Sequence, residues 1–144
     1  MRTLSWLICG TENAVLSYSP DLPDLSGLRA FMIANGWAKR ASDPDRFDSA
    51  IRRADRRVTV YVDDEIIGFG RAICDDVSNG YISMIAVDKA HRREGIGREI
   101  VRRLMGEDPR LTWVLRAGRP ESQAFWEAVG FRVSTVAMER PRER

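Results

Sequence analysis

The sequence predicts one α+β domain, spanning residues 1–144, in which short strands alternate with amphipathic helices. Two observations predict this class. The spacing of apolar residues changes several times along the chain, between the period of two typical of strands and the period near 3.6 typical of helices. The chain is also long enough for one hydrophobic core, and it contains no internal repeat, linker or low-complexity segment. We therefore expect a single unit with one mixed core.

The N-terminal part of the chain is predicted to form two strands followed by two helices. Their expected ranges are 4–9, 14–19, 24–35 and 44–54. Gly36 closes the first helix, because glycine is common just after a helix C-terminus. Asp43 caps the second helix, because its side chain can accept hydrogen bonds from free N–H groups, and Pro44 suits the first helical position.

The C-terminal part is predicted to continue with a hairpin, a strand, a helix, a strand, a helix and a last strand. The strands are expected at 58–62, 66–74, 81–87, 111–116 and 131–138. The hairpin turns at Asp63 and Asp64, and residues 75–80 form a loop before the next strand. One helix follows a basic turn that ends at Gly97, and the other starts at Gly118.

One segment in this part carries the most functional information. The apolar strand 81–87 ends at Asp88, a basic turn at 89–97 follows, and an amphipathic helix then begins. The first N–H groups of a helix have no partner within it, and the helix dipole adds positive potential at the same point. The turn therefore predicts an anion site suited to a pyrophosphate. Gly95 and Gly97 are expected to be glycine because a Cβ there would keep the backbone away from the phosphates.

Other glycine-rich turns fit this segment less well. A dinucleotide-binding turn needs the pattern G-x-G-x-x-G, and no third glycine follows Gly97 at that spacing. The P-loop pattern G-x-x-x-x-G-K-[ST] is absent from the chain. The remaining alternative is an ordinary tight turn between a strand and a helix, with a solvated surface of arginine and glutamate.

Composition narrows the function classes. Charged residues make up 31% of the chain, but the net charge is only +2, so no strong field points to nucleic acid. Cys9 and Cys74 are too few for a disulfide framework and lack the spacing of metal ligands, so no metal is expected. The apolar stretches are too short for a signal peptide or for the roughly 20 residues of a membrane span. We expect a reduced, cytoplasmic protein without a membrane or nucleic-acid partner.

Three motifs resemble the GNAT family of N-acetyltransferases. Residues 92–97, Arg-Arg-Glu-Gly-Ile-Gly, fit the family signature R/Q-x-x-G-x-G/A, and the Val-Asp pair that customarily precedes it is present. Residues 122–131, Ser-Gln-Ala-Phe-Trp-Glu-Ala-Val-Gly-Phe, resemble the second family motif, a helix that ends in Gly-Phe. Residues 66–71 resemble the strand that precedes the core of the family. The resemblance covers residues 58–138, and three motifs in order and spacing make it specific.

The resemblance implies the GNAT acyl-CoA N-acyltransferase fold, a bent and mostly antiparallel sheet with helices on both faces. Two central parallel strands, here 81–87 and 111–116, would splay apart and hold the pantetheine arm of the co-substrate acetyl-CoA. The first strand would bind the pantetheine amides through its backbone, and the turn would hold the pyrophosphate. The residues implied to bind acetyl-CoA are Ile85, Ala86, Val87, Arg92, Arg93, Glu94, Gly95, Ile96, Gly97, Arg98, Phe125 and Trp126.

The chain departs from the family pattern at three positions linked to catalysis. Trp126 stands where many members carry a tyrosine that protonates the departing thiolate, and an indole N–H is far too weak an acid for that step. Arg119 replaces the usual asparagine, and Val114 takes the place of a glutamate base found in the protein-N-terminal branch. The missing tyrosine and glutamate argue against an N-terminal acetyltransferase of the ribosomal-protein type.

Tyr81 is the residue predicted to have a catalytic or substrate-contact role, because it begins the first splayed strand, where several family members place a base. Strand alternation predicts that Ser83 and Ile85 share its face. A half-buried aromatic residue on a strand is the alternative. Asp75 and Asp76, in the loop before this strand, either hold an amine or form a solvated turn.

Two further residues have roles that the sequence leaves open. His91 is the only histidine and is expected at the surface of the phosphate turn, away from the acetyl group. Gly36 and Trp37 fall where the family builds its acceptor pocket. Trp37 would either contact a small substrate or fill the core.

The predicted function is transfer of the acetyl group of acetyl-CoA to a primary amine of a small molecule. Direct attack is expected, because neither cysteine has a histidine nearby in the sequence to support a covalent route. The alternative is a non-catalytic acyl-CoA-binding or regulatory module with the same fold. A nucleic-acid or structural domain has only the arginine content in its favour.

A homodimer is predicted by analogy with the family, since the apolar strand 131–138 could lie at an edge that needs covering.

Overall fold

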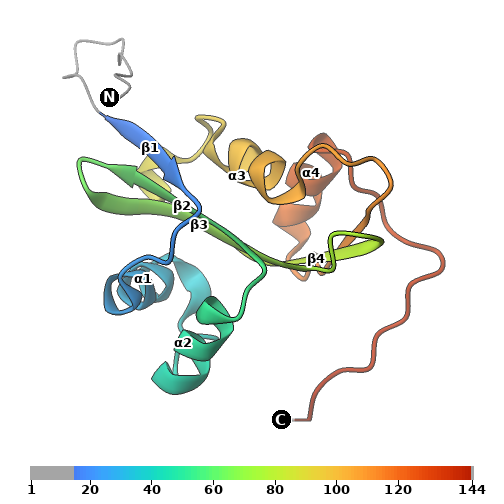
Figure 1. Cartoon of the computed structure of the whole chain (residues 1–144), viewed down its shortest axis with the longest axis horizontal. Helices are drawn as coiled ribbons and strands as arrows, with labels where there is room; N and C mark the ends of the chain where they lie inside the picture. The colour runs from blue at the N-terminus through green and yellow to red at the C-terminus, as the bar shows by residue number, and fades with distance from the viewer. Residues whose placement is uncertain (1–14, 144) are drawn as a thin grey trace.

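The structure is a computed structural model that describes residues 15–143 (Figure 1). The strands are β1 (Leu16–Ser19), β2 (Arg56–Val62), β3 (Glu65–Cys74), β4 (Asn79–Val87) and β5 (Thr112–Leu115). The helices are α1 (Leu25–Met32), α2 (Pro44–Arg52), α3 (Ile96–Met105) and α4 (Pro120–Ala128), with a π-helical turn η1 (Ile33–Trp37) and a short 3-10 helix η2 (Lys89–His91). The strand predicted at 4–9 lies outside the described residues.

The described strands form one sheet in the order β1-β2-β3-β4-β5. The first three pairings are antiparallel, and only β4 and β5 run parallel. β5 pairs with β4 only as far as Ile82 and Leu115, whereas β4 continues to Val87. The two parallel strands therefore separate beyond Ile82. This mixed, mostly antiparallel sheet with a splayed pair confirms the predicted fold class.

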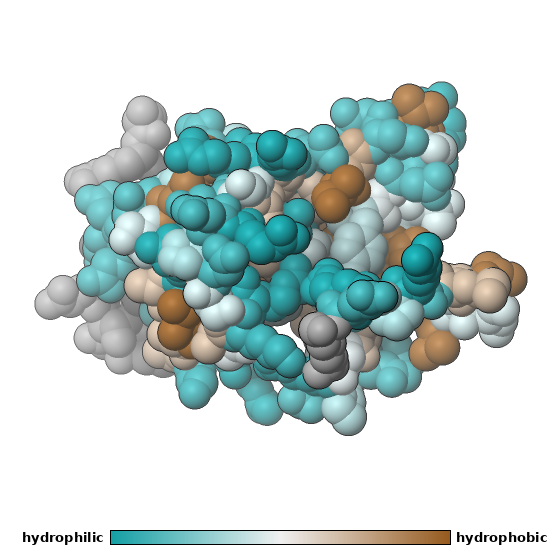
Figure 2. Space-filling view, turned by 90° about the horizontal axis from the view of Figure 1, so that it is seen from below, coloured by the Kyte–Doolittle hydropathy of each residue, from teal (hydrophilic) through white to brown (hydrophobic). Residues whose placement is uncertain are grey.

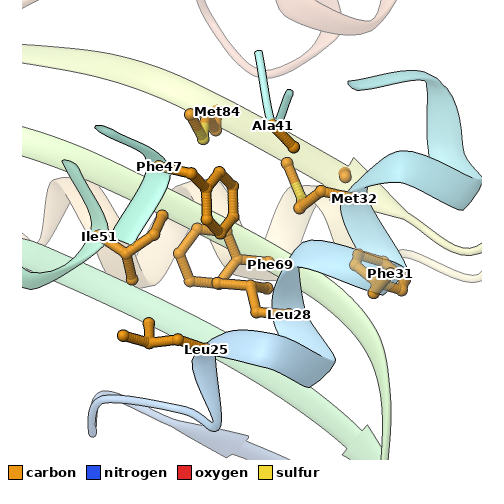
Figure 3. Close-up of a cluster of buried hydrophobic side chains, with 10 residues drawn as sticks. Leu25, Leu28, Phe31, Met32, Ala41, Phe47, Ile51, Phe69 and Met84 are labelled. Atoms are coloured by element: carbon orange, nitrogen blue, oxygen red, sulfur yellow. The ribbon is translucent and has the colours of Figure 1, made fainter. Parts of the chain in front are cut away.

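Helices cover both faces of the sheet, with α1 and α2 on one face and α3 and α4 on the other (Figure 1). Figure 3 shows the core on the first face, where Phe69 of β3 and Met84 of β4 meet helix side chains. Leu28 of α1 and Phe47 and Ile51 of α2 close this core, and each is at most 2% exposed. This packing fixes the position of the segment between α1 and α2 relative to β4.

The second core lies between the sheet and α3. Ile100, Val101 and Leu104 are buried at helical spacing and pack with Val60 and Ala72 of the sheet. Ile96 in the first turn of α3 is buried in the same core, and Val87 at the end of β4 packs against it, so the helix N-terminus is held near the end of that strand.

Two predicted helix boundaries are confirmed and have clear local causes. Asp43 caps α2, because its Oδ1 accepts hydrogen bonds from the N–H groups of Asp45 (3.1 Å) and Arg46 (3.2 Å). Gly36 has a φ of 95°, in the region that favours glycine, and it ends the helical path of α1 and η1. Trp37 follows directly and packs against the first core.

A β-bulge interrupts β4. Arg71 of β3 pairs with Met84, but the next residue, Ala72, pairs with Ile82. Ser83 is therefore an extra residue on β4 that has no partner on β3. A bulge of this kind reverses the alternation of side chains between the two faces of a strand.

The bulge overturns the prediction that Tyr81, Ser83 and Ile85 share one face. Tyr81 pairs with Ile73, which alternates with Phe69 and so lies on the face covered by α1 and α2. Ile85 packs with the core on the α3 side. The simple period-two reading was wrong because it assumed an uninterrupted strand.

The predicted last strand at 131–138 is also wrong, because this segment forms no strand in the structure. It leaves α4 and runs apart from the sheet (Figure 1). The Oγ of Ser134 accepts hydrogen bonds from two later backbone N–H groups, at 3.1 and 2.8 Å, which bends the chain. Val133, Val136 and Met138 are 71%, 87% and 98% exposed. The segment has the composition of a strand, but no described strand pairs with it.

Candidate active site

A cleft of about 980 Å³ opens where β4 and β5 separate. It extends from the turn before α3 to the segment after α1, and α4 forms a third wall. Its walls are residues 35–37, 39–40, 82–87, 91–93, 95–98, 115–116, 118–119, 121–122, 125–126 and 128–129. Segments that are far apart in sequence therefore meet at the gap between the parallel strands.

One end of the cleft is the N-terminus of α3. Gly95 is the N-cap residue, and no side chain caps the helix. The first intrahelical hydrogen bond runs from the N–H of Glu99 to the carbonyl oxygen of Gly95, at 3.1 Å. The N–H groups of Gly97 and Arg98 come before this bond and are left without a helical partner. Free donors and the positive end of the helix dipole therefore meet at the cleft wall, as an anion site requires.

The two glycines of this turn serve different purposes. Gly95 has a φ of 83°, and a Cβ added there would meet nothing within 4 Å, so its requirement is conformational. A Cβ on Gly97 would lie 3.2 Å from Cε1 of Phe125. Gly97 therefore lets the Phe125 ring of α4 pack on the first turn of α3. The predicted need for backbone access to phosphates is not the only reason for glycine at either position.

The side of the cleft along β4 is an unpaired strand edge. Residues 83–87 line the cleft, and within residues 15–143 no strand pairs with them on the side of β5. Ser83 bulges out of register with β3 at the start of this stretch. The backbone donors and acceptors along this edge can pair with an extended ligand, as they would with a further strand.

Most of the residues predicted to bind acetyl-CoA come together on this cleft. Eleven of the twelve line it, and Glu94 is the exception. Nε of Arg92 donates to the carbonyl oxygen of Val87 at 3.2 Å, which ties the phosphate turn to the end of β4. Nη2 of Arg98 donates to the carbonyl oxygen of Ala128 at 3.3 Å, which ties α3 to α4. These arginines add positive charge beside the free N–H groups of α3.

Trp126 is part of an aromatic cluster at the cleft wall. Its ring meets Phe125 edge-to-face at 5.0 Å and Phe131 edge-to-face at 5.4 Å between centroids. Trp126 also lines the cleft. The indole therefore packs α4 and shapes the cleft, at the position where an acid would be expected.

The other polar candidates are placed outside the cleft or are already engaged. Tyr81 does not line it. The Asp75 carboxylate accepts hydrogen bonds from Ser78 and from three backbone N–H groups, which lowers its pKa far below the usual value. Asp76 pairs with Arg56 at 2.6 Å. Both aspartates are engaged around the loop before β4 and lie outside the cleft wall.

His91 lines the cleft at the phosphate turn, as predicted for its position. Its Nδ1 lies 3.2 Å from Oδ2 of Asp88, the residue that also caps η2. The imidazole is therefore anchored to the turn.

The opposite end of the cleft contains contacts that sequence patterns did not indicate. Nη2 of Arg119 donates to the carbonyl oxygen of Gly36 at 3.1 Å, across 83 positions of sequence. Trp37 both lines the cleft and packs against the first core, so it fills the core as one of its predicted roles required, while its contact with a substrate stays a prediction. Arg40 lies over the Trp37 ring, with 6.0 Å between Cζ and the centroid. We call this region, formed by residues 35–40 and 115–119, the acceptor end.

Two structural features are absent from residues 15–143. No group of three or more His, Cys, Asp or Glu side chains there could hold a metal ion. No helix in the same part of the chain is long and apolar enough to cross a lipid bilayer.

The fold and cleft are those of an acetyl-CoA-dependent acetyltransferase. The sequence matches the profile of the acetyltransferase (GNAT) family over residues 23–131, which is more than half of the chain. The chain belongs to the GNAT family, whose members use acetyl-CoA as co-substrate. No curated protein sequence matches it.

Solved structures with low sequence identity share the fold. A protein from meticillin-resistant Staphylococcus aureus is 21% identical with a TM-score of 0.76, covering 90% of this chain and 99% of its own. A GNAT family acetyltransferase from Streptococcus pneumoniae is 17% identical, with a TM-score of 0.68 and the same coverage. An aminoglycoside N-acetyltransferase in complex with CoA is 16% identical, with a TM-score of 0.66, covering 94% of this chain and 99% of its own.

Proposed function

We propose that this acetyltransferase acts in the cytoplasm on a primary amine of a small molecule, by direct attack of the amine on acetyl-CoA. The observation that supports this most is the course of the cleft, which joins the unpaired edge of β4 to the uncapped N-terminus of α3. A pantetheine arm can add to that edge like a strand, and a pyrophosphate can accept from the N–H groups of Gly97 and Arg98.

The proposed chemistry needs polarisation of the thioester and two proton movements. The neutral amine attacks the carbonyl carbon, the C–N bond forms, and the C–S bond then breaks. Backbone N–H groups at the free edge of β4, near Ile85, can stabilise the negative charge that develops on the carbonyl oxygen. The amine nitrogen gives up a proton to solvent or to a base. The sulfur leaves as a thiolate that is protonated by water, which is feasible because a thiol is only a moderately weak acid.

Tyr81 remains our candidate for carrying one of these protons. Its side chain lies on the face of the sheet that α1 and α2 cover, the same face as the buried side chain of Arg71. Since Tyr81 itself is not part of the cleft wall, it would act through a water molecule.

Release of free thiol from acetyl-CoA in the presence of a panel of primary amines tests the proposal. We expect the second-order rate constant to rise with pH, because only the neutral amine attacks. Tyr81→Phe should lower the rate or displace one limb of the pH profile, while binding of acetyl-CoA is retained. An unchanged profile for Tyr81→Phe would remove this residue from the mechanism.

The alternative function is a non-catalytic acyl-CoA-binding module. The observation in its favour is Trp126, which occupies the usual position of the acid and is packed among aromatic rings. Calorimetry decides between the two functions. Binding of acetyl-CoA without thiol release from any amine in the panel would favour the module.

We also propose that the protein forms a homodimer. Val133, Val136 and Met138 are exposed apolar residues of the segment 131–138, and within residues 15–143 no strand pairs with the outer edge of β5. Residues 131–138 of a second copy can add to that edge, and two such additions close a symmetric pair.

Sedimentation should give a molecular mass twice 16.4 kDa for the wild type. Val136→Asp should weaken the dimer, and Val77→Asp, in an exposed loop, is the matched control. A monomeric wild type at high concentration would contradict the proposal.

A further inference from the structure

We infer that the amine acceptor also carries an anionic group, a carboxylate or a phosphate, which binds to basic side chains at the acceptor end of the cleft. This inference rests on the proposed function, since it assumes that the acceptor amine reaches the thioester through this cleft. It narrows the acceptor from any primary amine to one that bears an anion.

The charges on the cleft wall are strongly unequal. Arg92, Arg93 and Arg98 surround the phosphate turn, where the phosphates of acetyl-CoA account for them. The acceptor end has four further cationic residues on the cleft wall, Lys39, Arg40, Arg116 and Arg119. Glu121 is the single acidic residue on the wall. Figure 2 looks onto the face that carries α1 and α2, and hydrophilic side chains cover most of it.

A buried arginine lies near these cationic residues of the acceptor end. Arg71 is only 7% exposed and lies on the face of β3 that α1 and α2 cover, opposite Met84 of the cleft wall. Its Nε is buried without a hydrogen-bond partner, and within residues 15–143 its guanidinium forms no ion pair. The charge of Asp55 raises the pKa of Arg71, but no carboxylate pairs with the guanidinium directly, so an anion placed closer to it would be favoured.

The cations at this end also repel one another. Burial and then the charge of Arg40 lower the pKa of Arg71. Burial and then the charge of Arg142, from the C-terminal segment, lower the pKa of Arg40. An anion placed here would relieve the repulsion and pair with guanidinium groups, which match carboxylates and phosphates geometrically.

The chain itself shows how a carboxylate binds in this region. Oε2 of Glu139 lies 2.5 Å from Nε of Arg116. Lys39, Arg40 and Arg119 have no acidic partner among the described residues, although one N–H of the Arg119 guanidinium is engaged by the carbonyl oxygen of Gly36. Trp37, under the Arg40 guanidinium, adds an apolar surface for the carbon chain between amine and anion. Polyamines and aminoglycosides, which carry several positive charges, would be repelled.

Matched pairs of amines test the inference through thiol release from acetyl-CoA. 4-Aminobutanoate is compared with its amide, L-alanine with alaninamide, and O-phosphoethanolamine with ethanolamine. A diamine, 1,4-diaminobutane, is the cationic arm. We expect kcat/KM to be at least tenfold higher for the anionic member of one or more pairs. The pair with the largest ratio distinguishes a carboxylate from a phosphate.

Two variants connect the preference to the acceptor end. Arg40→Gln should raise KM for the preferred anionic amine about tenfold. The ratio of kcat/KM between this amine and its neutral counterpart should then approach one, while KM for acetyl-CoA stays unchanged. Arg46→Gln, on the exposed surface of α2 and away from the cleft, is the matched control and should keep the ratio. Arg40→Glu should shift the preference towards 1,4-diaminobutane. Thermal unfolding of each variant confirms that it is folded.

Failure of the inference can be distinguished from failure of the proposed function. If neutral or cationic amines are acetylated as well as the anionic ones, or if Arg40→Gln keeps the ratio, the inference is wrong and the proposed function stands. If acetyl-CoA binds but no amine in the set releases thiol, the proposed function fails and the inference fails with it.

Discussion

Replacing Gly95 separates the two properties of the phosphate turn, its backbone conformation and its affinity for an anion. A Cβ at this position would meet nothing within 4 Å, so alanine introduces no clash. It must, however, adopt a φ of 83°, which costs an L-residue about 1–2 kcal/mol of stability. Gly95→Ala should therefore lower the unfolding free energy by about that amount and change the affinity for acetyl-CoA by no more than about threefold, because the N–H groups stay in place.

Gly95→Glu adds a negative charge to the same strain. Two unit charges about 6 Å apart repel by about 0.7 kcal/mol in water and by about 2.8 kcal/mol at an effective dielectric constant near 20. Two phosphate charges double these values, to about 1.4–5.5 kcal/mol. The affinity for acetyl-CoA should then fall between about tenfold and about ten-thousand-fold relative to the alanine variant.

Calorimetric titration of both folded variants with acetyl-CoA measures this difference. The penalty should shrink as salt is raised, since mobile ions screen the added charge. Equal affinities for Gly95→Ala and Gly95→Glu at low salt would refute the assignment of the pyrophosphate to this turn.

Three further predictions concern single residues. Gly80→Ala places a Cβ against the Trp113 indole and should destabilise the protein by about 1–3 kcal/mol, seen as a lower denaturant midpoint. The hydrogen bond from Arg102 lowers the pKa of Glu99 from its usual 4.5 to about 2. The stability that Glu99 adds over Glu99→Gln should be present above pH 4.5 and vanish towards pH 2 in thermal scans. Trp126→Phe should keep acetyl-CoA binding and the pH profile of kcat/KM; loss of the chemical step alone would contradict our account of the site.

Features that depend on neighbouring residues could be predicted from the sequence. Asp43 and Pro44 determine the start of α2 through contacts within one helical turn, and Gly36 ends the first helix through its own φ. The turn at Gly95 has the same local character, which is why the uncapped N-terminus of α3 could be predicted from a few residues, while the anion it would bind stays a prediction.

Features that depend on register or on distant segments could not be predicted. Ser83 becomes a bulge only because of how β4 aligns with β3, and the alignment decides which face Tyr81 occupies. The hydrogen bond from Arg119 to Gly36 joins positions 83 residues apart. The apolar pattern of 131–138 gives a β-propensity, but the pairing it needs is absent from the described part of one chain.

Because β4 and β5 pair over only a short stretch, the stability of the folded protein in the cell should depend on the supply of acetyl-CoA. Four residue pairs join the two strands, and the rest of the β4 edge is left for a bound molecule. A ligand that occupies this gap at a hundred times its dissociation constant adds about 2.7 kcal/mol to stability. Because proteases in cells act on transiently opened chains, the abundance of this enzyme should fall when acetyl-CoA is scarce.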